Sequence, residues 1–534
     1  MAAGSGPQAH GRTAGRARSA AAWRRLAGVA VPLCLCAPVP AVSQCPDGTP
    51  PPCAHLAAAG RAAARNSVAV LPFDNVRLDS AFAYLADGLA SEIATSLAVV
   101  PRLEVRSPGV VRGLQRRTGG DPLLLGRRLG VRYVVEGDFQ RSGERLRVSV
   151  RLVTVSDGTQ RWSRAYTRIA TDLLAVQDDV AREVTISIAG QLLPHERSLL
   201  AARVTRDPEA WDHYLRGNYH LARRTQEGVD RAIEEYSLAT RIDPSFARAE
   251  AGVALGYALY ADWGWPSPLP LDTLVARGLA AAGRAIARDS TDSDGWMARG
   301  YLRSIQTARD YSLVLPDLER SVSLDPRNAE ALHQYASKMQ ELNDQERAIA
   351  LERRALEADP DRPVSQMTIG KAYWEMRRLE EARRAFDSSL ALDPAFYAAN
   401  VYRGQLELAQ GHLAAAWRDA DAAMRTALPG DAWRVTLRIA CLAAQGDTAA
   451  ASRALDEVAA PYDTAASISM QQVAALAYAA GRLGRVDDAL RWLARARPLG
   501  AILWADLLLP SYDPLRHDPR FRRFVDSIRP IRSR

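Results

Sequence analysis

The stretch PVSQMTIGKAYWEMRRLEEARRAFDSSLALDPAF, Pro363–Phe396, decides the fold of this 534-residue chain. It contains two helical patterns joined by a short polar break, and it ends on Asp393-Pro394. The same dipeptide occurs at Asp359-Pro360 and Asp325-Pro326, so it recurs at steps of 34 residues. A period of this length, built from two helices, predicts a solenoid in which each unit buries its apolar side against its neighbours.

The residues inside this unit follow a known pattern. Gly370 and Ala382 are small where paired helices must approach closely, and Tyr373 and Phe386 are large enough to fill the space between them. We expect each Asp-Pro to cap the following helix, and its proline to stop the preceding one. The pattern resembles the tetratricopeptide repeat (TPR). Positions that match it in several units are Gly217, Ala232, Tyr236, Pro244, Pro326, Pro360, Gly370, Tyr373, Ala382, Phe386 and Pro394.

The repeats are expected to fill residues 207–500 as about eight units, one or two of them degenerate. Ala261–Pro270 is expected to interrupt the array as a loop, and residues 501–534 to cover the last unit with the apolar side of a capping helix. Cys441 falls where a residue faces a partner helix, which favours a buried structural thiol over a nucleophile.

Stacked repeats curl so that the first helix of each unit lies on the concave face. That face is predicted to receive an extended peptide or a partner helix. A second interpretation, that these are simply exposed helix positions, stays open for each residue alone. The predicted groove residues are Glu330, His333, Ser337, Gln340, Val364, Met367, Lys371 and Trp374.

Residues 66–195 have a different pattern, which predicts a small α/β domain. Val68–Phe73 is a continuous apolar run of strand length, typical of a strand buried on both faces. Apolar residues at i+4 spacing follow from Leu85 to Leu97 and predict a helix. Alternation over Leu146–Val153 predicts a strand with one buried face and one wet face, on which Arg147 and Arg151 are interpreted as solvated rather than as an anion site. The expected order is β-α-β-α-β-β-β-α.

Several segments of this domain resemble the TolB-like (FlgO-like) amino-terminal domain of bacterial proteins. They are Ser67–Asp74, Tyr84–Leu89, Leu129–Val134, Glu136-Gly137 and Leu174–Asp178. The resemblance implies a cell-envelope location and a binding or assembly role, and it carries over no catalytic residue.

Residues 1–43 contain five arginines and no acidic residue, followed by a short apolar stretch and small residues. This pattern predicts a secretory signal peptide, with an uncleaved membrane anchor as the alternative. Residues 44–65 form a Pro/Ala-rich linker, in which Cys45 and Cys53 flank a turn-forming loop. In an oxidising compartment this spacing favours a Cys45–Cys53 disulfide.

The formal charge of +8 therefore does not indicate nucleic-acid binding, because five of these charges belong to the predicted signal. The sequence contains no phosphate-binding, nucleophile-elbow or zinc-protease motif, so no catalytic, metal or cofactor site is predicted. We expect a multidomain protein, with a small α/β domain followed by an all-α TPR solenoid.

Its expected function is that of an exported, non-enzymatic scaffold. It would bind other cell-envelope proteins through the TPR groove, in the periplasm or at the envelope of a bacterium, with the α/β domain as a second docking or assembly surface. The alternative is a regulatory module in which the α/β domain binds a small ligand and the array relays the signal.

Overall fold

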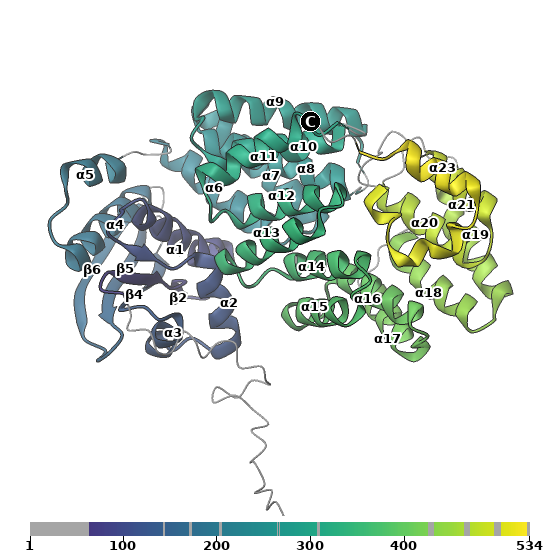
Figure 1. Ribbon diagram of the computed structural model, residues 1–534. Helices are drawn as coiled ribbons and strands as arrows, with labels where there is room; N and C mark the ends of the chain where they lie inside the picture. The colour runs from purple at the N-terminus through teal and green to yellow at the C-terminus, as the bar shows by residue number, and fades with distance from the viewer. Residues whose placement is uncertain are drawn as a thin grey trace, which may run out of the picture. The chain divides into compact units, whose positions relative to one another are not determined.

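A small α/β domain is followed by stacked helix pairs, which confirms the predicted fold class (Figure 1). The computed structural model describes residues 64–142, 145–169, 173–201, 205–263, 265, 267–306, 310–425, 432–463, 470–495 and 504–530. The predicted signal peptide and the Cys45–Cys53 pair lie outside these residues. Among the described helices, none is long and apolar enough to cross a membrane.

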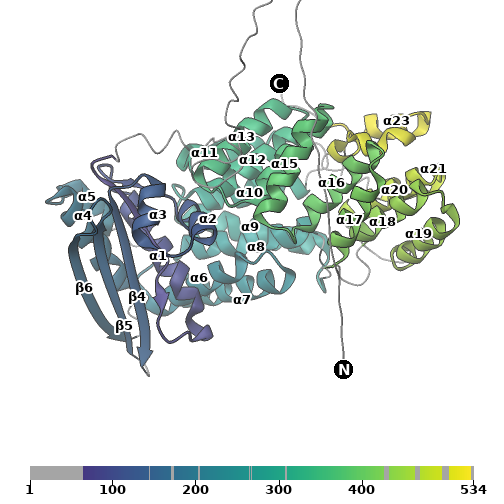
Figure 2. The ribbon, with the colours of Figure 1, turned by 90° about the horizontal axis from the view of Figure 1, so that it is seen from below.

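The sheet of the α/β domain has the strand order β3-β1-β4-β5-β6, and the short β2 pairs with β4. Strand β1 is parallel to β3 and β4, whereas β4, β5 and β6 run antiparallel to one another. Figure 2 shows β4, β5 and β6 side by side. The strands are β1 (Ser67–Val70), β2 (Asp74–Asn75), β3 (Glu104–Val105), β4 (Tyr133–Ser142), β5 (Arg145–Thr154) and β6 (Gln160–Ile169).

Helices cover both faces of the sheet at β1 and β4. The predicted apolar stripe of α1, from Leu85 to Leu97, is buried together with α4 against one face. Helices α2 and α3 pack on the other face through Val111 and Leu125. The helices are α1 (Ala83–Ala98), α2 (Pro108–Thr118), α3 (Pro122–Leu129), α4 (Leu173–Ala189) and α5 (Pro194–Ala201), with a 3-10 turn, η2 (Ser80–Phe82).

The structure adds α2 and β2 to the order expected from the sequence. Helix α2 contains few large apolar residues, and the residues buried on it are Gly109, Val111 and Gly113. The predicted exposure of Arg147 and Arg151 is confirmed, and Arg151 lies 3.2 Å from Glu136 across the strands.

Eight consecutive helix pairs make up the array within the described residues. Ala261–Pro270 does not interrupt the array as predicted: α8 continues to Trp263, and the rest of the segment joins α8 to its own partner, α9. The pairs are α6 (Pro208–Leu221) with α7 (Gln226–Ile242), α8 (Ala247–Trp263) with α9 (Leu271–Arg288), α10 (Ser293–Gln306) with α11 (Val314–Leu324), α12 (Ala329–Glu341) with α13 (Gln345–Ala358), α14 (Pro363–Glu375) with α15 (Leu379–Leu392), α16 (Tyr397–Ala409) with α17 (Leu413–Met424), α18 (Ala432–Ala444) with α19 (Thr448–Asp463), and α20 (Met470–Arg482) with α21 (Val486–Arg495).

The Asp-Pro pairs stop helices as predicted, but their predicted role as caps of the next helix is wrong. Asp325, Asp359 and Asp393 are the C-cap residues of the preceding helices. Their backbone is extended, which is the conformation that a residue before proline prefers. The carboxylate then accepts a hydrogen bond from a backbone N–H two residues later, for example Ala395 at 2.9 Å from Asp393. The pairs therefore make the turn between repeats.

Small residues bring the two helices of a pair together. A Cβ atom added to Gly370 would lie 2.6 Å from the ring of Phe386, and one added to Gly217 would lie 2.5 Å from the ring of Tyr236. Ala232 and Ala382 are wholly buried in the same seams. Each large ring thus occupies the volume that a side chain at the glycine would need.

The α/β domain and the array share one hydrophobic core. Its buried residues continue from the sheet through α1 and α4 into α6, α8 and α10. Tyr84 of α1 donates a hydrogen bond to Asp212 of α6, and Arg216 lies over the Tyr84 ring at 5.1 Å from its centroid. An ion pair at 3.6 Å joins Glu92 of α1 to Arg248 of α8.

The carboxyl-terminal tail caps the array, as expected, and also contacts earlier repeats. It contains η5 (Pro510–Leu515) and α23 (Pro519–Ser527), and Phe521 and Leu515 are buried beside the last pair. Asp506 lies 2.9 Å from Lys371, and Asp513 pairs with Arg377 at 2.7 Å. The tail is therefore tied to α14 across three intervening helix pairs.

We predict opposite effects from alanine at two helical glycines. Gly370→Ala should lower the free energy of unfolding by about 1–3 kcal/mol, since its methyl group would overlap the Phe386 ring. Gly283→Ala on α9 is the control, because no atom lies within 4 Å of its added Cβ. It should raise stability by about 0.5–1 kcal/mol. Urea unfolding followed by circular dichroism measures both, and equal stability of the two variants would contradict the account of the packing.

Candidate functional site

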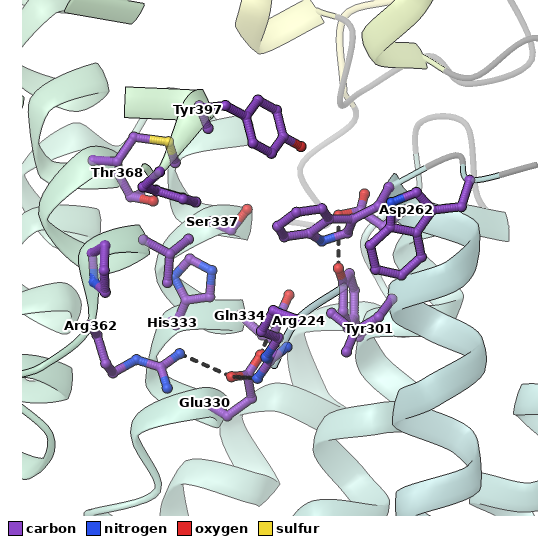
Figure 3. Close-up of a pocket in the computed structure, with 18 of the residues that line it drawn as sticks. Arg224, Asp262, Tyr301, Glu330, His333, Gln334, Ser337, Arg362, Thr368 and Tyr397 are labelled. Carbon is purple, nitrogen blue, oxygen red and sulfur yellow. Dashed lines mark hydrogen bonds and ion pairs between the residues drawn. The ribbon is translucent and has the colours of Figure 1, made fainter. Parts of the chain in front are cut away.

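A large cavity opens on the concave side of the array (Figure 3). Its volume is about 1340 Å³, and its lining comes mainly from α8, α12, α14 and α16, with Gly109, Arg112 and Arg116 of α2 beside them. Most of the lining therefore comes from first helices of the stacked pairs. Amide and hydroxyl groups line it beside apolar ones, including Gln334, Ser337, Thr368 and Tyr397.

Seven of the eight predicted groove residues line this cavity. They are Glu330, His333, Ser337, Gln340, Val364, Met367 and Lys371. That they bind a partner stays a prediction.

The prediction for Trp374 was wrong. Its side chain is completely buried, in the core shared by the later repeats. Residues on a helix turn by 100° each, so ten residues rotate Trp374 by about 80° away from Val364. Residues spaced three or four apart stay on the same face of a helix for only about two turns, and Trp374 lies farther than that from Val364.

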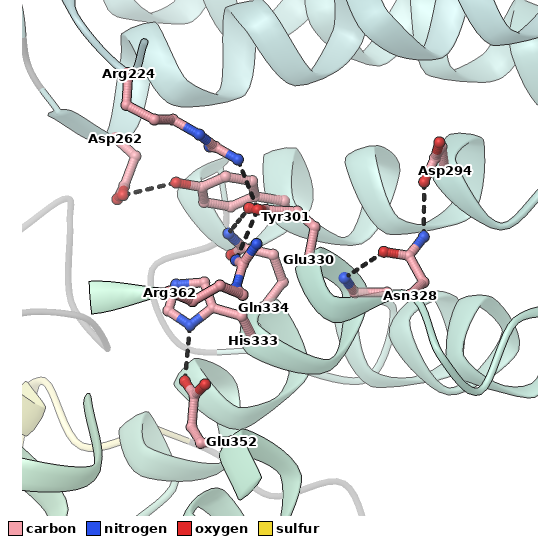
Figure 4. Close-up of polar contacts among 11 residues, drawn as sticks. Arg224, Asp262, Asp294, Tyr301, Asn328, Glu330, His333, Gln334, Glu352 and Arg362 are labelled. Carbon is pink, nitrogen blue, oxygen red and sulfur yellow. Dashed lines mark hydrogen bonds and ion pairs between the residues drawn. The ribbon is translucent and has the colours of Figure 1, made fainter. Parts of the chain in front are cut away.

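Glu330 is the centre of a charged cluster in the cavity wall (Figure 4). Its carboxylate accepts hydrogen bonds from Arg224 at 2.6 Å and from Arg362 at 2.9 Å. Gln334 donates a third, at 3.1 Å. Burial opposes ionisation of Glu330, but the two arginines outweigh it and hold the pKa of this carboxyl well below its usual value. The group is therefore an anion whose charge is neutralised inside the wall.

Two further polar pairs fix side chains of the same wall. His333 Nδ1 lies 2.7 Å from Glu352, a residue with no exposed surface. The Tyr301 hydroxyl donates to Asp262 at 2.7 Å, and burial followed by the charge of Asp262 raises the pKa of this tyrosine well above 10. Tyr301 and Asp262 thereby connect α10 to the end of α8.

The only two lysines of the chain both line the cavity. Lys338 pairs with Glu341 at 2.5 Å, and its side chain is 3% exposed. Lys371 pairs with Asp506 and lies 4.9 Å from the centroid of the Tyr402 ring. Burial disfavours the charged form of Lys371, but Asp506 outweighs it and raises the pKa. Each ammonium group thus has its counter-ion within the protein.

The arrangement is suited to noncovalent binding. No group of three or more His, Cys, Asp or Glu side chains that could hold a metal ion occurs in the part of the chain that the structure describes. Cys441 is a free, buried thiol whose burial raises the pKa to about 12, so it stays protonated at neutral pH. The cavity instead offers hydrogen-bonding groups and aromatic rings from different repeats.

Sequence reasoning missed Arg224, Asp262, Tyr301 and Arg362. Arg224 is 106 residues from Glu330 along the chain. It lies just after α6 with φ of 51°, at a turn position with positive φ that recurs in later pairs as Asn343, Arg377 and Gly411. Arg362 directly precedes Pro363, and its position before a groove helix was the one available signal.

Replacing Glu330 should show how much this charged cluster contributes to the free energy of unfolding. Glu330→Gln should lower the free energy of unfolding at pH 7 by about 3 kcal/mol, because it removes the carboxylate that both partly buried arginines contact. The pKa of Glu330 is lower in the folded protein than in the unfolded chain, where it is near 4.5. Ionised Glu330 therefore stabilises the fold above about pH 4.5, and this stabilisation is lost as the pH falls below that value.

The variant should consequently lose less stability than the parent between pH 5 and about pH 3. Glu346→Gln is the control, since Glu346 is 76% exposed and lies 3.7 Å from Arg378. It should change stability by less than about 0.5 kcal/mol. Urea unfolding at several pH values tests this, and parallel pH profiles for parent and Glu330→Gln would contradict it.

Comparison with known proteins adds one repeat match and several partial similarities. Residues 365–396 match the family described as Tetratricopeptide repeat. A Rhizobium meliloti protein named "Putative adenylate cyclase 3" is 30% identical over 238 residues, which are 45% of this chain and 39% of that protein. The chain therefore spans less than half the length of this relative.

Two solved structures are also similar. PilF of Pseudomonas aeruginosa is 17% identical with a TM-score of 0.34, over 43% of this chain and 96% of that one. Yeast Tom70 is 12% identical with a TM-score of 0.37, over 67% and 82% of the two chains. The matched repeat at 365–396, set in eight helix pairs of the described residues, identifies the array as one of tetratricopeptide repeats.

Proposed function

We propose that this chain is a non-enzymatic scaffold that binds a segment of a partner protein in the cavity of its TPR array. The observation that carries the proposal is the composition of the cavity wall. Hydrogen-bonding side chains such as Gln334, Gln340 and Thr368 line it together with apolar ones such as Val364 and Met367. An extended polypeptide likewise presents both backbone polar groups and side chains.

The wall is also held in place before a partner arrives. Ion pairs and hydrogen bonds within it fix Glu330, His333 and Lys371. Side chains that are already ordered lose little conformational entropy on binding, so the interaction energy is retained as affinity.

The place of action belongs to the same proposal. The basic, acid-free segment at residues 1–43 supports export, and the segments that resemble a TolB-like domain support partners in the cell envelope. The α/β domain would then act as a second docking surface, through the open half of its sheet near Arg147.

A second candidate function is a relay from the α/β domain to the array. The shared core at Tyr84, Asp212 and Arg216 favours it, because a ligand that shifts α1 would move α6 as well. A small-molecule screen on the full chain, read as a rise in thermal midpoint, tests this candidate.

Photo-crosslinking in the native cell tests the groove directly. A photoreactive amino acid in place of Val364, in the cavity lining, should capture a specific partner. The same group in place of Leu313, which is 61% exposed and lies outside that lining, should not.

A variant that blocks the cavity shows whether capture of the partner depends on it. Ser337→Trp places a large ring in the cavity and should reduce capture from position 364 by about tenfold. Ser388→Trp, on the exposed side of α15, is the matched control and should leave capture unchanged. Equal capture from positions 364 and 313, or capture that Ser337→Trp does not reduce, would contradict binding in the groove.

A further inference from the structure

One wall of the cavity is a continuous run of aromatic rings. Tyr260 and Trp265 have centroids 5.8 Å apart, and Trp265 lies 5.4 Å from Trp263. Trp263 then contacts Tyr397 at 6.3 Å, and Tyr397 contacts Trp433 at 5.3 Å. All five residues line the cavity.

This run joins parts of the array that are far apart in the sequence. Its rings come from α8 and the segment after it, from the first residue of α16, and from α18. Figure 3 shows Tyr397 across the cavity from Asp262, which precedes Trp263 at the end of α8. The aromatic wall therefore spans the groove, and a bound segment would lie against it.

The same cavity contains a buried donor without a partner. Gln340 is 4% exposed and lines the cavity, and its Nε2 group has no hydrogen-bond partner among the described residues. Leaving a buried amide N–H unpaired costs about 1–3 kcal/mol. A carbonyl oxygen supplied by a bound molecule would remove this cost.

The buried charges of the cavity wall are already paired, which favours a partner segment without charge where it contacts them; Arg112, Arg116 and Arg223 also line the cavity, and Arg116 is 69% exposed to solvent. Glu330 is neutralised by two arginines, and Lys338 and Lys371 each have a carboxylate as counter-ion. A charged peptide would have to compete with these internal pairs, whereas an uncharged one leaves them intact.

We propose that the cavity binds a proline-rich, uncharged segment of the partner in the polyproline II conformation. This inference rests on the proposed function and names the class of its partner. Proline has no backbone N–H but keeps its carbonyl, so such a segment presents acceptors and needs donors such as Gln340 Nε2. Its rings stack on aromatic side chains, and its stiff backbone loses little entropy on binding.

The probe is a fluorescein-labelled peptide of twelve residues that repeats Ala-Pro-Pro, titrated with the full chain by fluorescence anisotropy. Peptides of equal length that repeat Gly-Ser, Ala-Glu or Ala-Lys are the comparisons. We expect the proline peptide to bind about tenfold more tightly than each of them. Its affinity should change by less than about twofold between roughly 50 and 300 mM NaCl, because no ion pair forms on binding.

Two variants locate the peptide. Trp263→Ala should weaken binding about tenfold, and Gln340→Met, which removes the donor but keeps the volume, about fivefold. Trp296→Ala is the matched control: this ring lies on α10 outside the cavity lining, 4.6 Å from the Arg299 guanidinium. It should bind like the parent. Thermal midpoints show whether each variant is folded, and the two changes lie on different helices, so one remains informative if the other fails to fold.

Several results would overturn the inference. They are absence of binding by the proline peptide up to about 1 mM, tighter binding of the Ala-Glu or Ala-Lys peptide, and unchanged affinity in a folded Trp263→Ala or Gln340→Met variant. If the photoreactive group at position 364 captures a partner but the proline peptide does not bind, the proposed function stands and this inference falls. If neither occurs, both fall.

Discussion

The close approach of paired helices is the constraint on which the rest of the structure depends. A glycine or alanine on the first helix faces a large ring on the second, as Gly370 faces Phe386 and Gly217 faces Tyr236. Since no side chain can be added there without overlap, the distance and rotation of the two helices are fixed. The first helices of neighbouring pairs then stack with one face toward a common cavity. The cavity is thus a consequence of packing that occurs on the other side of the same helices.

Ion pairs within the protein determine which groups the cavity can offer to a partner. A chain with 69 basic and 61 acidic residues could have exposed a strongly charged groove. Instead Glu330, Lys338 and Lys371 are each matched by an opposite charge from another repeat, a neighbouring residue or the tail. Between these paired charges the wall offers aromatic surface and neutral hydrogen-bonding groups, and exposed arginines such as Arg116 also line the cavity. Such a surface selects a partner by shape and by carbonyl acceptors more than by charge.

The sequence predicts the repeats well because their signal is local and periodic. The 34-residue step, the Gly370 seam and seven of the eight groove residues follow from spacing along single helices. The prediction for Trp374 failed because a helix turns by 100° per residue, so residues spaced three and four apart gradually rotate away from the groove. The predicted capping role of Asp-Pro failed because two residues separate each proline from the first residue of the next helix.

Contacts between distant repeats could not be predicted in this way. The pairing of Arg224 with Glu330, the ring contact of Trp263 with Tyr397, and the salt bridge of Lys371 with Asp506 depend on how eight described pairs curl together. No periodicity encodes that curvature, because it accumulates from small rotations at each interface. The shared core of α1 and α6 is equally nonlocal, and it makes the α/β domain part of the same folded body as the first repeats.

The most direct measurement of the central claim is a structure of the full chain bound to the partner captured in the cell. The account predicts an extended segment along the cavity wall, with a carbonyl oxygen within hydrogen-bond distance of Gln340 Nε2 and side chains against Trp263 and Tyr397. A partner that leaves this cavity empty and docks only on the open sheet face near Arg147 would contradict it.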